Sequence, residues 1–178
     1  SSSIDTILSN SILHDIAGDQ ATMLISPLIE SDPSLHVISP IILYNFDTFD
    51  DTLNATGYNA RFTSDENTII YSKVGDDIGS QLDYSGIYKY SLNTQESIAV
   101  ADSAFRLDYL LSNEKNRILW LNKIPMVDSL EILIHHIDIN QTDTLEIRLG
   151  LDQVADPISI YWDRNDNIYT TLLDGNGI

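Results

Sequence analysis

The residues best suited to bind a metal ion lie in the loop DRNDN, at positions 163–167. Asp163, Asn165 and Asn167 alternate along this loop, and carboxylate and amide oxygens at alternating positions are the ligands of calcium loops. Such a loop needs a Gly at its sixth position, whereas this sequence has Ile168 there. Calcium is therefore the one cofactor that the sequence suggests, and an ordinary β-turn is the favoured alternative for the same residues.

Two further groups of carboxylates could gather a cation. Each lies at a polar corner, and together they comprise Asp47, Asp50, Asp51, Asp76, Asp77 and Asp83. Paired carboxylates could also serve a glycosidase, whose two acids must face each other about 5 to 10 Å apart. A chain with 27 acidic residues contains many accidental pairs, so solvated corners are the favoured interpretation.

Nucleophilic catalysis finds no support in the spacing of the reactive residues. The sequence has no G-x-S-x-G motif and no cysteine. His135 and His136 are neighbours, so they point to opposite faces of any strand and cannot bind one metal from the same face. We assign no catalytic residue and expect a structural or surface role for both histidines.

The elements that hold these residues repeat along the chain. In ARFTSDENTIIYSK, residues 60–73, a polar turn separates two apolar runs, as in a β-hairpin. The same pattern surrounds SNEKN and DRND, and the runs after the three turns begin at Ile69, Ile118 and Ile168, which are 49 and 50 residues apart. A fourth hairpin is expected near residue 20. The second strands of the later hairpins are predicted at residues 68–74, 117–122 and 167–172.

Each hairpin is followed by an alternating segment, a polar corner and one more strand. The alternation is clear in Tyr88, Tyr90 and Leu92, as expected for a strand with one buried face. A unit of four strands in about 45 to 50 residues is typical of a β-propeller blade. We therefore expect an all-β chain that forms a β-propeller domain, or a segment of one, over residues 1–178. Its approximate repeats are residues 9–57, 58–103, 104–150 and 151–178, with an additional N-terminal strand at residues 4–8.

The second repeat is similar to a known family of repeats. ARFTSDENTIIYSK and the following GIYKYSLNTQESIAV resemble the TolB-type, WD40-like (PD40) propeller repeat, in which an aromatic residue precedes a Ser-Pro-Asp-Gly-like turn. In that repeat, an I-Y-x-x-(D/S)-L segment then leads to a Thr-Gly-like corner. Asn67 replaces the usual turn Gly, and no Pro follows Ser64 or Ser112. The resemblance implies a β-propeller built from such blades.

Both ends of the sequence are expected to fall inside a blade. Gly177 and Ile178 correspond to Gly86 and Ile87, at the start of a third strand. Either the N-terminal strand closes a small ring of four blades, or the sequence is a stretch of a larger propeller, which is favoured. A blade without its third strand has an open edge, which predicts pairing with another chain or a homo-oligomer.

Charge and composition restrict the partners. The formal net charge of −18 repels phosphate backbones and anionic surfaces, so no nucleic-acid partner is expected. The apolar runs are far shorter than the ~20 residues that span a bilayer, so no membrane insertion is expected. A basic protein partner suits this charge better.

The function favoured by the sequence is that of a non-catalytic β-propeller, a protein-binding or assembly module. It is expected outside the cytoplasm, in the periplasm, at the cell surface or in secreted form. Aromatic-rich blades supply a rigid frame, while no nucleophile, base and orienting group can be combined from spacing. The alternative is the propeller domain of a hydrolase, a glycosidase or a peptidase, whose catalytic parts lie elsewhere or are not recognisable in this sequence.

Overall fold

The computed structural model describes residues 11–27, 39–46, 51–74, 84–105, 109–123, 129–148 and 157–172. Every regular element in these ranges is a β-strand. The described residues contain no helix that is long and apolar enough to cross a membrane. The chain divides into two compact units, residues 1–103 and 104–178. The N-terminal strand expected at residues 4–8 lies outside the described ranges.

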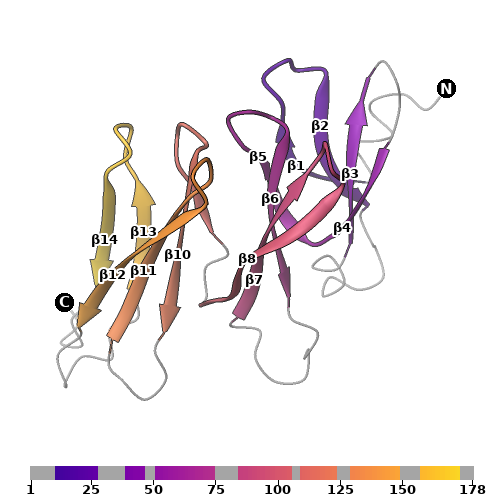
Figure 1. The fold of residues 1–178 in the computed structure, drawn as a ribbon. Helices are drawn as coiled ribbons and strands as arrows, with labels where there is room; N and C mark the ends of the chain where they lie inside the picture. Colours follow the sequence, from indigo (N-terminus) through magenta and orange to yellow (C-terminus); the bar gives the residue numbers. More distant parts are fainter. Residues whose placement is uncertain are drawn as a thin grey trace. The chain divides into compact units, whose positions relative to one another are not determined.

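The first unit contains two antiparallel sheets of four strands each (Figure 1). The strands of the first sheet are β1 (Ser11–Ile16), β2 (Thr22–Pro27), β3 (Pro40–Asn45) and β4 (Asp51–Thr56). The strands of the second sheet are β5 (Tyr58–Phe62), β6 (Thr68–Val74), β7 (Tyr84–Ser91) and β8 (Glu96–Phe105). Strands adjacent in each sheet are also adjacent in sequence, so each sheet is a meander. Gly57 alone separates β4 from β5.

The second unit contains the third and fourth sheets, which follow the same order. The strands of the third sheet are β9 (Leu110–Leu111), β10 (Arg117–Lys123), β11 (Ser129–His136) and β12 (Gln141–Arg148). The described fourth sheet is a hairpin of β13 (Pro157–Trp162) and β14 (Ile168–Leu172). The expected second strands are β6, β10 and β14, each beside the first strand of its sheet. The expected all-β fold is thus confirmed, and the first three sheets have the expected four strands.

Apolar side chains fill the space between neighbouring sheets within each unit. The core between the first and second sheets includes Leu24, Ile41, Leu53, Phe62, Ile69, Tyr71 and Tyr90. The core between the third and fourth sheets includes Leu119, Leu121, Ile132, Ile160, Trp162 and Ile168. Full burial of a side chain such as Leu or Phe stabilises a fold by about 1.5–3 kcal/mol, so these cores hold adjacent sheets together.

The four hairpin turns share one backbone geometry. The fourth residue of each turn adopts the left-handed region, namely Gln20 (φ 57°), Glu66 (φ 54°), Lys115 (φ 55°) and Asp166 (φ 57°). In the second sheet, the N–H of Thr63 donates to the carbonyl of Thr68 at 3.0 Å, and the N–H of Glu66 donates to the carbonyl of Thr63 at 3.1 Å. The left-handed residue is therefore Glu66, one place before the Asn67 that the sequence pattern aligned with the turn Gly. Backbone hydrogen bonds, rather than a Gly, hold this turn.

Candidate functional site

In each four-stranded sheet, the hairpin turn and the corner between the last two strands lie at one end, which we call the turn end. Backbone hydrogen bonds join the two loops at equivalent places. They run from Phe46 to Ala21 (3.1 Å), from Leu92 to Asn67 (2.9 Å) and from Ile137 to Asn116 (2.9 Å), with the first residue of each pair donating its N–H. The turn ends are therefore rigid supports for the side chains that they carry.

A carboxylate links the turns of adjacent sheets within each unit. In the first unit, Glu66 Oε1 accepts the N–H of Gly18 at 2.6 Å. A Cβ atom at Gly18 would lie 2.8 Å from this oxygen, so a larger residue would displace the carboxylate. In the second unit, Asp166 Oδ1 accepts the N–H of Asn113 at 2.9 Å. In both links the fourth residue of one turn accepts from the second residue of the turn before it.

The link in the second unit includes an ion pair. Arg117 donates to Asp166 Oδ2 at 3.0 Å, and the side chain of Asp166 is only 6% exposed. The guanidinium also lies over the ring of Trp162, with its carbon 5.1 Å from the ring centroid. Burial disfavours the charged form of Asp166, but the hydrogen bonds from Asn113 and Arg117 outweigh it and lower the pKa of this carboxyl.

The proposed calcium ligands Asp163, Asn165 and Asn167 lie together in the turn of the fourth sheet. The carboxylate of Asp163 accepts the N–H groups of Asn165 and Asn167, both at 2.8 Å, and the side-chain amide of Asn167 at 2.9 Å. These bonds, first that from the Asn167 side chain, lower the pKa of Asp163. The contacts are those of a β-turn stabilised by its own Asp, and calcium binding stays a prediction.

The remaining acidic candidates offer no described geometry. Asp47, Asp50, Asp76, Asp77 and Asp83 lie outside the described ranges, as does the side chain of Asp51. Within the ranges that are described, no three His, Asp or Glu side chains come together in an arrangement that could hold a metal ion.

The described histidines make local hydrogen bonds. His14 Nε2 lies 2.8 Å from Ser26 Oγ, and burial, followed by the nearby Arg61, lowers the pKa of His14 to about 4. His135 and His136 lie on opposite faces of β11, as predicted. His135 is buried, with Nδ1 3.0 Å from Thr142 Oγ1, whereas the partly exposed His136 lies 3.1 Å from a carboxylate oxygen of Asp143.

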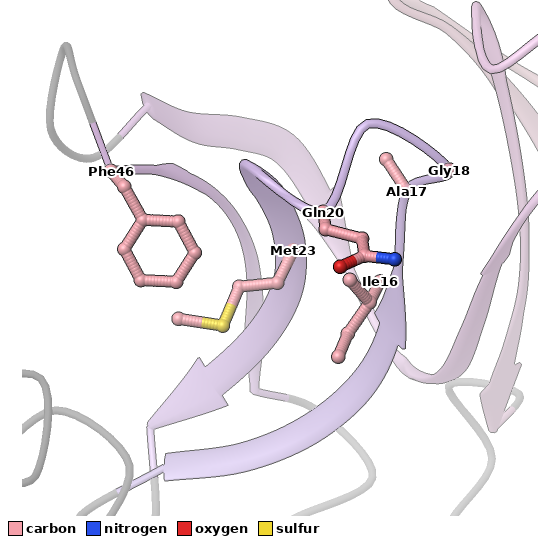
Figure 2. Close-up of a pocket in the computed structure, with 6 residues that line it drawn as sticks. All are labelled: Ile16, Ala17, Gly18, Gln20, Met23 and Phe46. Atoms are coloured by element: carbon pink, nitrogen blue, oxygen red, sulfur yellow. The ribbon is translucent and has the colours of Figure 1, made fainter.

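An apolar hollow lies beside the turn end of the first sheet (Figure 2). This first-sheet hollow has a volume of about 510 Å³ and is lined by Ile16, Ala17, Gly18, Gln20, Met23 and Phe46. Ile16 is 47% and Phe46 is 36% exposed, whereas Met23 is buried. The sequence reasoning missed this feature. The repeat could have revealed the hollow. Phe46 takes the place of Leu92, which packs against the core between the first two sheets, so Phe46 is expected on an equivalent apolar surface.

A second, polar hollow lies beside the turn end of the third sheet. It has a volume of about 290 Å³ and is lined by Glu114, Asn116, Arg117, His136, Asp138 and Ile139. Arg117 and His136 are held by the carboxylates of Asp166 and Asp143, which leaves the carboxylates of Glu114 and Asp138 at its exposed rim.

Comparison with known proteins identifies the fold. No protein-family model matches this sequence, and a search of curated proteins finds no match to it. Among solved structures, one from a study of two prolyl endopeptidases has a TM-score of 0.57 at 10% identity, covering 93% of this chain and 27% of that chain. The β-propeller domain of the Trilobed protease from Pyrococcus furiosus has a TM-score of 0.52 at 11% identity, covering 91% of this chain and 52% of that chain.

A third similar structure is an oligogalacturonate lyase from Vibrio parahaemolyticus. Its TM-score is 0.51 at 9% identity, with 90% of this chain and 53% of that chain covered. The chain therefore spans only about a quarter to a half of the length of these three structures. At such low identity the similarity shows a β-propeller fold and nothing more specific.

Proposed function

We propose that this chain is a non-catalytic β-propeller module of the TolB-type, WD40-like class, which binds a basic protein partner through its acidic turn ends outside the cytoplasm. The observation that carries the proposal is the distribution of carboxylates. Exposed acids occur at the turn ends of sheets in both units, and those described are Asp19, Asp65, Glu66, Glu96, Glu114 and Asp138. Together with a net charge of −18, they give these ends a negative potential.

The strength of such binding comes from several contacts acting together. One exposed ion pair contributes only about 0.2–1 kcal/mol, so a single lysine would not hold the partner. Several carboxylates on rigid turns attract a basic segment before contact and fix its orientation afterwards. Salt screens this attraction beyond about 8–10 Å, so the affinity for a basic partner should fall as the salt concentration rises.

A pair of charge-matched variants of the full chain tests the proposal, with a lysine-rich peptide as the probe and calorimetry as the measurement. Glu114→Gln with Asp138→Asn removes two carboxylates from the turn end of the third sheet. Glu131→Gln with Glu146→Gln removes two from the middle of β11 and β12 in the same sheet. The first variant should bind the peptide several-fold more weakly than the second. Equal losses would mean that only net charge matters and would refute binding at the turn ends.

A second candidate function rests on the structural comparisons. The similar structures include a lyase and peptidases, and this chain covers only part of each. In this alternative, the chain is the propeller portion of an enzyme. Hydrolysis of peptides or cleavage of oligogalacturonate by the purified chain would support it and would contradict the non-catalytic proposal.

A further inference from the structure

One face of the second sheet packs on the first sheet. The first sheet has an equivalent face, on its side away from the second sheet. We call this the rear face of a sheet. In the second sheet it carries Phe62, Ile69, Tyr71, Tyr88, Tyr90 and Leu92, which all contact the core between the first two sheets. At equivalent places, counted from the hairpin turn and from the corner, the first sheet has Ile16, Met23, Ile25, Ile42, Tyr44 and Phe46. Both rear faces are apolar throughout.

Met23, Ile25 and Tyr44 on the rear face of the first sheet are buried, and the two rear faces differ only near the turn end. Phe62 is 1% exposed, whereas Ile16 at the equivalent place is 47% exposed. Phe46, the counterpart of Leu92, borders the first-sheet hollow together with Ile16 (Figure 2). The hollow is therefore the open end of a surface whose counterpart is covered by another sheet. Its residue types suit a β-sheet with an apolar face better than a small polar ligand.

A polar group at the rim of the hollow supports the same interpretation. Glu66 and Asp166 accept the N–H of the second residue in the preceding turn, in one link within each unit. The residue at this place in the first sheet is Gln20, which lines the hollow and whose side chain carries an amide oxygen that can accept. The first sheet thus has both the apolar face and the acceptor with which the second and fourth sheets dock on their neighbours.

The fourth sheet carries a face of the complementary kind. Ile160, Trp162 and Ile168 pack toward the third sheet, so the alternating Tyr161 and Tyr169 point away from it. These two rings stack with centroids 5.4 Å apart and are 50% and 48% exposed. The second residue of this turn is Arg164. A neighbouring sheet docked here would place its acceptor opposite the Arg164 N–H.

We propose that the exposed turn end of the rear face of the first sheet, at Ile16 and Phe46, binds the fourth sheet of a second copy of this chain. The contact repeats the turn-end part of an interface already present inside the chain: Tyr161 and Tyr169 would cover Ile16 and Phe46, and the Arg164 N–H would meet Gln20. The exposed guanidinium of Arg164 would lie near Asp19, beside Gln20. Because the two surfaces differ, the interface is heterologous, and copies add head to tail into a ring or a short chain.

Salt should act on this contact in the opposite direction from its effect on a basic partner. Each copy has a net charge of −18, so copies repel each other at low ionic strength while the docking surfaces themselves are mostly apolar. Screening of the repulsion should strengthen self-association. The outcome of this proposal is therefore independent of the proposed binding of basic proteins, which concerns the carboxylates of the turn ends.

The test is analytical ultracentrifugation of the full chain, from low micromolar to near-millimolar concentration, at low and high sodium chloride. Reversible oligomers that increase with protein and with salt are expected. Ile16→Ser with Phe46→Ser, and separately Tyr161→Ser with Tyr169→Ser, should weaken association by about tenfold or more. The control Leu145→Ser removes an exposed apolar side chain from β12 and should leave association unchanged.

Mixing the two double variants gives the decisive result. One variant keeps an intact fourth sheet and the other an intact first sheet, so an equimolar mixture should form heterodimers that neither variant forms alone. A chain that stays monomeric under all conditions, a mixture that does not associate, or an equal loss in the Leu145 control would each overturn the proposal. If circular dichroism shows that a serine variant is misfolded, the corresponding alanine variant replaces it with the same expected outcomes.

Discussion

Shortening Phe62 and Ile16 to alanine, in separate variants, should give very different losses of stability although the two residues hold equivalent places in adjacent sheets. Phe62 is 1% exposed, and truncation of a buried Phe costs about 3–5 kcal/mol through lost transfer energy and the cavity left behind. Ile16 is 47% exposed, so about half of its transfer energy is absent and little cavity forms. Its loss should be about 1 kcal/mol, below the range for buried aliphatic residues.

Urea denaturation at low protein concentration measures both losses, since dilution keeps a second copy off the first sheet. With a denaturant slope of about 2 kcal/mol per molar, the midpoint should fall by about 1.5–2.5 M for Phe62→Ala and by about 0.5 M for Ile16→Ala. Equal shifts would refute the reasoning, because they would show that the rear face of the first sheet is as fully packed in the monomer as that of the second. At high protein concentration, the Ile16 loss should grow.

Three other measurements test the account of the turns and of the partly buried His14. Burial, followed by a nearby guanidinium, lowers the pKa of His14 to about 4, so between about pH 6.5 and pH 4 the unfolded chain binds more protons. The unfolding free energy should fall as the pH decreases through this window, and His14→Asn should remove that part of the pH profile. Asp166→Ala should destabilise the second unit by about 1–3 kcal/mol in thermal unfolding, because the backbone N–H of Asn113 and the side chain of Arg117 lose their acceptor. Asp166→Asn should recover part of this loss. A variant without any recovery would contradict the hydrogen-bond account. Millimolar calcium should leave the melting temperature nearly unchanged, because the oxygens of Asp163 already accept N–H groups, whereas a saturable rise abolished in Asp163→Ala would reveal a site.

The hairpins and the blade repeat could be predicted because strand and turn patterns are local. The apolar runs that begin at Ile69, Ile118 and Ile168 are the second strands of their sheets, and the polar turns before them reverse the chain. The left-handed turn residues were harder to place. Glu66 and Lys115 are not typical of that backbone region, and only the hydrogen bonds of the closed turn show why they adopt it.

The candidate sites could be predicted only in part. Oxygens at Asp163, Asn165 and Asn167 alternate whether they face a cation or stabilise their own turn, so the sequence pattern cannot separate the two arrangements. The link from Glu66 to Gly18 joins residues 48 positions apart, and its counterpart uses an Asp, so no single motif marks it. The rear faces of the first and second sheets have the same apolar pattern, and the different exposure of Ile16 and Phe62 follows only from three-dimensional packing.

The meander order of the strands has a consequence for how this chain is made. Because strands that pair are adjacent in sequence, each sheet closes only short loops, and the entropy cost of its formation is small. Strands of one sheet can therefore pair soon after they leave the ribosome, but the apolar faces of that sheet are buried only when a neighbouring sheet packs on them. Each new sheet then packs on the preceding sheet, on the face opposite to the rear face of that sheet, as in other repeat proteins in which folding spreads from neighbour to neighbour.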